Sequence, residues 1–261
     1  MDGKIAYTSN SLLHVLDMAD RSVTPVANTV HAAFPDWHPS GERIALGTSK
    51  ILIYDLNTQQ VTSTTQDTLV ASYPAWHPSG NMLAFDVKQR NEDGLYFQEF
   101  ETNVEFGVDL PFPVFQADWH PNGREIVFVG IVNNQKHIFK LDMSCVTSRD
   151  CADKVQQLTR TGKFNHAPAW SPDGQHIAFE TYLDTEKRWV IMVMDADGSN
   201  PRRLSGPDAN DHHPTWGPEG WIAFQRQTEQ GNRLFMMRAD GSEVTQLTET
   251  EAVEPDWWYP H

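Results

Sequence analysis

Six tryptophans recur along this chain at similar intervals, each within a related short sequence. Successive members of the set are 39 to 51 residues apart, and the set comprises Trp37, Trp76, Trp119, Trp170, Trp216 and Trp257. In the first five copies a Pro-x-Gly turn follows the Trp, and a short apolar segment such as Ile-Ala-Phe comes after the turn. Repeats of this length are typical of β-propeller blades, which have four strands each. The sequence therefore predicts an all-β fold.

The sixth copy is divided between the two ends of the chain. It begins at Glu254-Pro-Asp-Trp257 and stops at His261, whereas residues 1–7 (MDGKIAY) read as its missing second half. We therefore predict a single six-bladed propeller over residues 1–261, whose last blade combines residues 251–261 with about residues 1–28. One strand comes from the C-terminus and three from the N-terminus, which leaves no open sheet edge at the closure.

Each predicted blade is a small antiparallel meander. Residues 175–180, 189–194 and 201–204 read as strands, and the Asp-Ala-Asp-Gly sequence at 195–198 reads as a hairpin turn. A lone four-stranded blade cannot bury both of its faces, so neighbouring blades must stack. We expect each repeated Trp to fill the space between two blades.

The repeat resembles a known family unit. Residues 168–179, PAWSPDGQHIAF, resemble the TolB-type, WD40-like PD40 repeat, whose signature is Pro-x-Trp-Ser-Pro-Asp-Gly followed by Ile-Ala-Phe. The resemblance covers essentially the whole chain, with His in place of Ser at His38, His77 and His120. It implies a propeller that serves as a protein docking platform, as a side domain of a serine peptidase or, in a seven-bladed branch, as a metal-dependent pectin lyase.

The charge balance limits the classes of partner. The chain has 35 acidic and 20 basic residues, which gives a formal net charge of −15. Phosphate binding needs clustered Lys and Arg, so we expect no nucleic-acid partner. The chain has no apolar run near the roughly 20 residues of a membrane helix, so we expect no membrane insertion. We predict a monomer whose acidic excess either keeps it soluble or attracts basic partners and cations.

The two cysteines bear on the compartment. Cys145 and Cys151 lie in a loop between strands expected at 136–142 and 154–158. Six positions apart across a hairpin loop, they can form a disulfide that stabilises the fold by roughly 2–3 kcal/mol. A disulfide predicts a periplasmic or extracellular protein, and a pair of free thiols in the cytoplasm is the alternative. Residues 1–3 lack the features of a signal peptide, so either one was removed or there was none.

Candidate binding residues lie just before the repeated Trp, on the strands expected to line the central channel. Aligned on the Trp, these positions form rings around the axis, from which we select Phe34, Tyr73, Gln116, His166, Asp211, His212, His213 and Glu254. Imidazoles and a carboxylate at one end of a channel are suitable ligands for a divalent metal, and the metal candidates are His166, His213 and Glu254. The alternatives are histidines that only hydrogen-bond to their neighbours, or contacts to a polar ligand or peptide.

The position directly before the Trp is acidic in three blades. Asp36, Asp118 and Asp256 either bind a cation on the axis or accept backbone N–H bonds that fix the following turn. The histidines directly after the Trp recur with the repeat instead of converging, so we interpret them as turn-forming residues.

Common catalytic motifs are missing from the sequence: there is no Gly-x-Ser-x-Gly, no phosphate-binding loop and no His-Glu-x-x-His. We therefore favour a non-catalytic module that binds a protein partner, without a cofactor, through loops and the channel mouth. Its candidate aromatic anchors are Phe34, Tyr73, Phe115 and Trp258. The alternatives are a metal-dependent carbohydrate-active enzyme that resembles oligogalacturonate lyase and uses the channel histidines, or the propeller domain of a larger enzyme.

Overall fold

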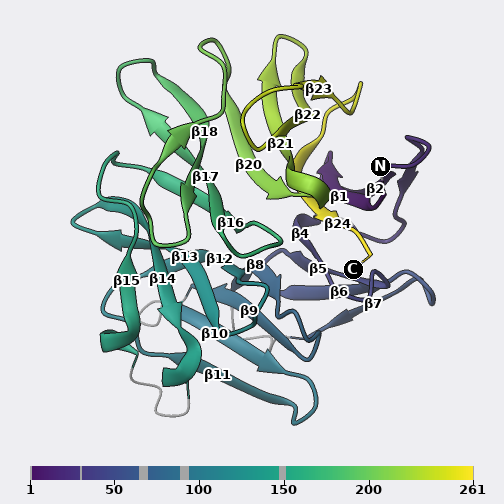
Figure 1. Ribbon diagram of the computed structural model, residues 1–261. Helices are drawn as coiled ribbons and strands as arrows, with labels where there is room; N and C mark the ends of the chain where they lie inside the picture. Colours follow the sequence, from purple (N-terminus) through teal and green to yellow (C-terminus); the bar gives the residue numbers. More distant parts are fainter. Residues whose placement is uncertain (1, 30, 65–69, 89–93, 147–150, 261) are drawn as a thin grey trace.

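The described residues form six four-stranded antiparallel sheets, arranged as blades around a central axis (Figure 1). The computed structural model describes residues 2–29, 31–64, 70–88, 94–146 and 151–260. Within these ranges no helix is long and apolar enough to cross a bilayer. The short 3₁₀ helices are η1 (Met143–Cys145), η2 (Ala152–Lys154) and η3 (Pro218–Gly220). The predicted all-β, six-bladed architecture is confirmed.

Each blade runs outward from its innermost strand. Blade 1 contains β4 (Ala33–Trp37), β5 (Arg43–Gly47), β6 (Ile51–Asp55) and β7 (Gln60–Ser63). Blade 2 contains β8 (Ala71–Trp76), β9 (Met82–Val87), β10 (Gly94–Glu99) and β11 (Val104–Val108). Blade 3 contains β12 (Val114–Trp119), β13 (Glu125–Val132), β14 (Gln135–Asp142) and β15 (Val155–Gln157).

The remaining blades follow the same order. Blade 4 contains β16 (Asn165–Trp170), β17 (His176–Leu183), β18 (Arg188–Asp195) and β19 (Arg202–Arg203). Blade 5 contains β20 (Asp211–Trp216), β21 (Trp221–Thr228), β22 (Gly231–Arg238) and β23 (Thr245–Gln246). Blade 6 contains β24 (Val253–Trp258), β1 (Lys4–Ser9), β2 (Leu12–Asp17) and β3 (Val23–Pro25).

The ring closes through blade 6, where the two ends of the chain meet in one sheet. Strand β24 pairs antiparallel with β1, so that Trp257 lies opposite Ile5. The sheet order β24-β1-β2-β3 confirms the predicted closure of one C-terminal strand with three N-terminal strands. Met1 and His261, the chain ends within the predicted range of this blade, lie outside the described residues.

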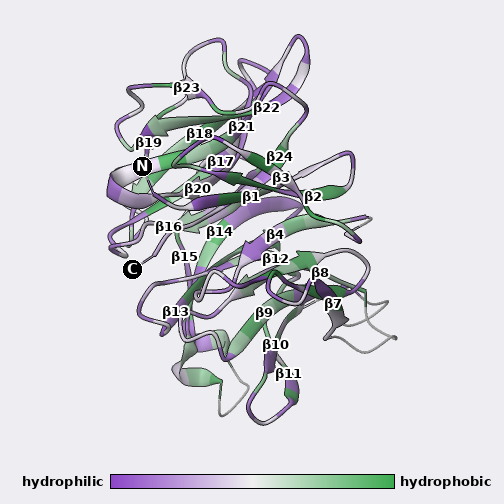
Figure 2. Cartoon of the chain, turned by 90° about the vertical axis from the view of Figure 1, so that its right-hand side faces the viewer, coloured by the Kyte–Doolittle hydropathy of each residue, from purple (hydrophilic) through white to green (hydrophobic). Residues whose placement is uncertain are grey.

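The core is divided among the contacts between blades. The repeated tryptophans are only 4–7% exposed, and each lies in a different apolar cluster that combines residues of two adjacent blades. Trp76, for example, packs with Ile53 of blade 1 and Leu83 of blade 2. Figure 2 shows the hydrophobic residues concentrated on the strands, with more hydrophilic loops at the outside. The expected packing of each Trp between neighbouring blades is therefore present.

Candidate functional site

The innermost strands surround a channel that has a cavity at each end. A cavity of about 580 Å³ lies at the C-terminal ends of these strands, and one of about 120 Å³ lies at their N-terminal ends. Both are lined by Pro35, Ala117, Pro168, Pro214 and Pro255, which lie between them. We call the end with the larger cavity the aspartate mouth, and the end with the smaller cavity the histidine mouth.

One residue of every innermost strand has left-handed backbone torsions. Their φ angles lie between +45° and +55°, and we call the set the bulge ring: Phe34, Tyr73, Gln116, Ala167, His213 and Glu254. Each lies where the pairing with the next strand changes register, which is a β-bulge. All six line the smaller cavity. This conformation costs a non-glycine residue on the order of 1 kcal/mol, so the histidine mouth is built with backbone strain.

Aromatic rings form an arc around the histidine mouth. The ring centroids of Phe34 and Tyr73 are 3.9 Å apart. Phe115 lies 6.3 Å beyond Tyr73, and His213 lies 6.5 Å from Phe34 on the other side. Blade 4 contributes only the small side chain of Ala167 to this ring. The bulge ring therefore has aromatic side chains in blades 1, 2 and 5 and its smallest side chain in blade 4.

A buried glutamate lies beside the predicted histidines. The side chain of Glu180 is 3% exposed, and its Oε2 lies 3.3 Å from His212 Nδ1 and accepts the His213 N–H at 2.9 Å. Its Oε1 lies 3.9 Å from His166 Nδ1. Burial would raise the pKa of Glu180, but His213 and His212 outweigh it and hold the pKa below its ordinary value. Glu180 was missed by sequence reasoning; the available signal was a charged residue directly after the apolar Ile-Ala-Phe.

Trp189 and Lys136 complete the surroundings of His166. The Trp189 ring centroid lies 5.0 Å from that of His166 and 5.8 Å from that of His212. The Lys136 ammonium lies 5.2 Å from the centroid of Phe115. Burial lowers the pKa of His166 to about 4, against the opposing effect of Glu180, and burial also lowers the pKa of Lys136. His166 is therefore neutral at physiological pH.

Three side chains at this mouth accept the backbone N–H of a bulge-ring residue in the next blade. The N···O distances are 2.9 to 3.1 Å, for Glu254 with Phe34, Gln116 with Ala167, and Glu180 with His213. Glu254 also accepts the hydroxyl of Thr8 at 3.1 Å. These bonds tie neighbouring blades together and hold the strained backbone.

The predicted metal candidates make separate contacts in the structure. Across the described ranges, no three His, Cys, Asp or Glu side chains are grouped so as to hold a metal ion. Of the candidates, His166 faces Glu180, whereas Glu254 is bonded to Thr8 and Phe34. A divalent metal in the channel stays a prediction that metal analysis can test.

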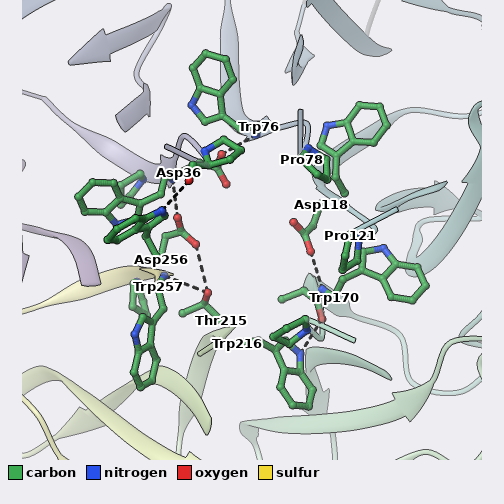
Figure 3. A pocket seen from close by; sticks show the side chains of 18 of the residues that line it. Asp36, Trp76, Pro78, Asp118, Pro121, Trp170, Thr215, Trp216, Asp256 and Trp257 are labelled. Carbon is green, nitrogen blue, oxygen red and sulfur yellow. Dashed lines mark hydrogen bonds between the residues drawn. The ribbon is translucent and has the colours of Figure 1, made fainter. Parts of the chain in front are cut away.

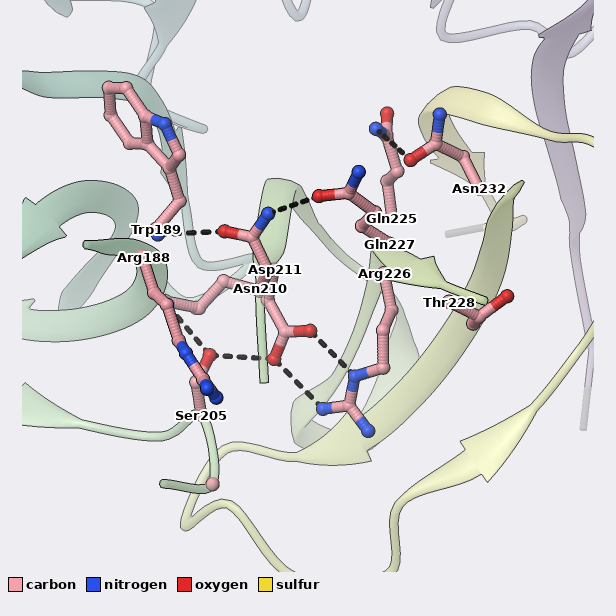
Figure 4. A network of polar contacts seen from close by, with 12 residues as sticks. Arg188, Trp189, Ser205, Asn210, Asp211, Gln225, Arg226, Gln227, Thr228 and Asn232 are labelled. Carbon is pink, nitrogen blue, oxygen red and sulfur yellow. Dashed lines mark hydrogen bonds and ion pairs between the residues drawn. The ribbon is translucent and has the colours of Figure 1, made fainter. Parts of the chain in front are cut away.

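Asp211 is separated from the other candidates. It is fully buried and forms a two-pronged ion pair with Arg226, with N···O distances of 2.6 and 2.8 Å (Figure 4). It also accepts the Ser205 hydroxyl at 2.7 Å, and it lines neither cavity. The neighbouring Asn210 accepts the backbone N–H of Trp189 at 2.9 Å, so this network joins blades 4 and 5 beside the histidine mouth. Both carboxylate oxygens of Asp211 are thus bonded within the protein.

The carboxylates of the aspartate mouth bridge adjacent blades (Figure 3). Each accepts the backbone N–H of the next blade's Trp at 2.6 to 2.7 Å: Asp36 from Trp76, Asp118 from Trp170, and Asp256 from Trp37. The Thr215 hydroxyl lies 3.4 Å from the Trp257 nitrogen and 3.3 Å from Asp256. A backbone role for these residues was expected, but the bonds connect blades instead of fixing the following turn.

The same carboxylates are held in an unfavourable environment for charge. Burial raises the pKa of Asp118 to about 7 and that of Asp256 to about 6, although backbone N–H bonds from Trp170 and Trp37 oppose the shift. Burial and the charge of Asp256 raise the pKa of Asp36 well above its ordinary value. No Lys or Arg is among the described residues that line this cavity. Ionisation of these carboxylates therefore opposes folding.

The hydrogen bonding of each indole depends on which residue precedes the Trp in the neighbouring blade. Where the preceding blade has Ala, the indole Nε1 donates to that alanine's carbonyl: Trp119 to Ala75 at 3.2 Å and Trp216 to Ala169 at 3.0 Å. Where it has Asp or Thr, the Nε1 has no hydrogen-bond partner among the described residues, as for Trp37, Trp76, Trp170 and Trp257. Each blade contact thus has either a side-chain bond to the Trp backbone or an indole bond.

The histidines after the Trp also connect blades. His38 Nδ1 lies 2.8 Å from Ser40 of its own turn, whereas its Nε2 lies 3.1 Å from the Gly80 carbonyl in blade 2. A Cβ on Gly80 would meet the imidazole at 2.5 Å, which explains the glycine there. In blade 6, Trp258 takes this position and donates its Nε1 to the Pro39 carbonyl at 3.0 Å. The predicted turn role therefore accounts for the contact of His38 Nδ1 within its own turn, but not for the contact of Nε2 with the next blade.

The two cysteines are joined in the structure. Cys145 and Cys151 form a disulfide with Cα atoms 5.2 Å apart, and both side chains are buried. The pair lies between β14 and β15 on the outer side of blade 3. Residues 147–150 of this loop lie outside the described residues.

Comparisons with known proteins agree on one family. The PD40 family, described as the TolB beta propeller domain, matches residues 102–259. The Protein TolB homolog of Chlorobium luteolum is 28% identical over 132 residues, or 51% of this chain. The crystal structure of TolB from Acinetobacter baumannii superposes with a TM-score of 0.83 at 20% identity, covering 99% of this chain and 67% of that one.

The matches cover only part of the relatives' length or are low in sequence identity. The Chlorobium match covers 28% of that protein, so this chain matches less than a third of the relative's length. A chain in the crystal structure of a nidogen/laminin complex also superposes over 97% of both chains, with a TM-score of 0.78 at 8% identity. At such low identity the likeness extends to the fold alone.

Proposed function

The chain belongs to the TolB β-propeller domain family, and on that premise we propose that it is a non-catalytic module that binds a protein partner at the histidine mouth. The observation that carries the proposal is the aromatic arc at this mouth, in which Phe34, Tyr73 and His213 line the smaller cavity and Phe115 lies next to Tyr73. Large rigid rings with partial exposure are the side chains that most often anchor protein interfaces.

The bulge ring supports this proposal. Strained backbone persists only where surrounding structure over-determines it, and such strain gathers at functional sites. Here the strain directs six different side chains into one cavity, and bonds from Glu254, Gln116 and Glu180 hold it in place. A metal-dependent carbohydrate-active enzyme that uses the channel histidines is the alternative function.

The disulfide supports a location. Disulfides persist in oxidising compartments, so we infer from Cys145–Cys151 that the protein works in the periplasm or outside the cell. The cytoplasm is the alternative. Thiol alkylation of the protein taken directly from cells, followed by mass measurement, distinguishes the two: modification of both cysteines without a reducing agent contradicts the inference.

The proposed binding is tested by capture with paired variants. Wild type, the double variant Phe34→Ala/Tyr73→Ala and the control Val104→Ala, on the outer strand of blade 2, are each used to capture proteins from an extract of the producing cells. We expect wild type and the control to retain the same partner and the double variant to lose it, with melting curves to show that all three are folded. Equal capture by the double variant rejects the histidine mouth as the binding surface.

A further inference from the structure

The smaller cavity has a shape and lining that suit one kind of chemical group. Its volume is about 120 Å³, which is close to the size of a single side-chain end. Five of its six bulge-ring positions carry large or polar side chains, and the sixth is Ala167. In the ring of six blades, Ala167 of blade 4 lies across the axis from Phe34 of blade 1.

The walls offer aromatic faces to a cation. Phe34 and Tyr73 pack against each other with centroids 3.9 Å apart, and His213 also lines the cavity. Phe115, which is not among the described lining residues, extends the arc beyond Tyr73. Aromatic faces attract an ammonium group placed within about 6 Å of the ring centroid. The protein already makes this contact at the edge of the mouth, where the Lys136 ammonium lies 5.2 Å from the Phe115 centroid.

The charge of the cavity has the complementary sign. Glu254 lines it, and no Lys or Arg is among its described lining residues. After burial itself, the nearby carboxylates of Asp86, Glu254 and Glu180 are what raise the pKa of the Tyr73 hydroxyl. The negative potential of three carboxylates thus meets at the aromatic wall.

We propose that this cavity binds the ammonium end of an alkylammonium group, presented as a lysine side chain by the partner protein. The assignment to a partner's lysine rests on the proposed function; the ammonium site itself does not. Calcium prefers six to eight oxygen ligands, and much of the lining of this cavity is aromatic carbon instead. A guanidinium binds most tightly where paired acceptors match its planar fork, whereas an ammonium is a compact point charge. The net charge of −15 also favours a basic partner.

Small probes test the site without the partner. Binding of n-butylammonium, the neutral n-butanol, n-propylguanidinium and choline is measured by calorimetry or ligand-observed NMR at pH 7 and low salt. We expect n-butylammonium to bind about tenfold more tightly than n-butanol, the ratio expected of a cation–π and carboxylate site. Equal binding of n-butanol overturns the ammonium site. Tighter binding of n-propylguanidinium overturns the choice of ammonium, and tighter binding of choline overturns the choice of lysine.

Variants locate the binding and separate charge from shape. Tyr73→Leu should weaken n-butylammonium about tenfold, and Tyr73→Phe should retain it because the ring face is kept. Glu254→Gln, which keeps acceptors for Thr8 and Phe34, should weaken it several-fold. The matched control Glu105→Gln, on β11, should change nothing. Unchanged affinity in both Tyr73→Leu and Glu254→Gln overturns the assignment to this cavity.

The two proposals fail in different ways. If n-butylammonium binds as expected but no partner depends on Phe34 and Tyr73, the ammonium site stands and the protein-binding proposal fails. If a partner is captured through these residues but n-butylammonium binds no better than n-butanol, the partner is held by other chemistry and the ammonium site is rejected. A captured partner should lose affinity when the lysine it presents to the mouth is replaced by norleucine.

Discussion

The same six strands end in two different kinds of surface. At the aspartate mouth the side chains repeat, as Asp, Ala or Thr, and their bonds are made to the backbone and indoles of neighbouring blades. At the histidine mouth no two bulge-ring residues are the same, and the backbone that carries them is strained. The repeat therefore keeps the contacts that close the ring at one end, whereas at the other end the side chains differ from blade to blade.

The largest test of this comparison uses two tryptophans. Trp216 is 7% exposed between blades 4 and 5, whereas Trp189 is partly exposed beside the histidine mouth. We expect Trp216→Ala to lower the free energy of unfolding by about 3–5 kcal/mol, because a large buried side chain is removed. Trp189→Ala should cost about 1.5 kcal/mol or less. Denaturant unfolding measures both variants. Equal losses of unfolding free energy would contradict the contrast between the two mouths.

The two mouths should also respond to pH in opposite directions. Asp118 has a folded pKa of about 7, above its ordinary value of 3.8, so its ionisation opposes folding. The stability contributed by protonated Asp118 is fully present below about pH 4 and is lost as the pH rises through 7. At pH 8 we therefore expect Asp118→Asn to be more stable than wild type by about 1–3 kcal/mol, since the amide oxygen still accepts the Trp170 N–H. At pH 4.5 the two proteins should be nearly equal.

Glu180 provides the opposite case. Its pKa is held below the ordinary value, so the ionised form stabilises the fold, and this contribution is lost as the pH falls through the folded pKa. Glu180→Gln should therefore lower stability at pH 7 by about 1–3 kcal/mol, with a smaller effect in acid. Thermal melts from pH 4 to 8 compare both variants with Asp208→Asn, whose carboxylate is almost fully exposed. If both variants shift stability with the same sign, the electrostatic contrast is rejected.

A smaller effect tests why blade 2 has alanine at the aspartate mouth. Ala75 lies between blades whose Asp36 and Asp118 already resist ionisation. Ala75→Asp adds a fourth carboxylate to the aspartate mouth, so we expect a loss of about 1–2 kcal/mol at pH 8 that disappears at pH 4.5. The uncharged Ala75→Asn separates charge from size. A loss of equal size in both variants at both pH values would show that the alanine is required for space alone.

The sequence predicted the ring of six blades, but it did not predict the hydrogen bonds and ion pairs between and within the blades. The Trp spacing predicted the six blades, because each interface repeats the same apolar contact, and alignment on the Trp brought His166, His212 and His213 to one mouth. It did not predict Glu180, which reaches the histidines through the pairing of β16 with β17 and a contact to the next blade. Nor did it separate Asp211 from them, because Arg226, fifteen positions away, binds that carboxylate inside blade 5.

The smallest expected effect concerns the backbone strain of the bulge ring, which a substitution at Ala167 tests almost without changing side-chain contacts. This residue has a φ of +45°, and its methyl group is the smallest side chain in the ring. Ala167→Gly removes almost no contact, but it relieves the steric cost of left-handed torsions, so the variant should be more stable by about 0.5–1 kcal/mol. Ala169, two positions later on the same strand, has no such torsion, and Ala169→Gly should lose a similar amount through the added freedom of the unfolded chain. Opposite signs at two alanines of one strand, measured by urea unfolding, would locate the strain at the bulge. A loss at both would mean that the left-handed backbone is relaxed, and the strain would then no longer distinguish the histidine mouth from the aspartate mouth.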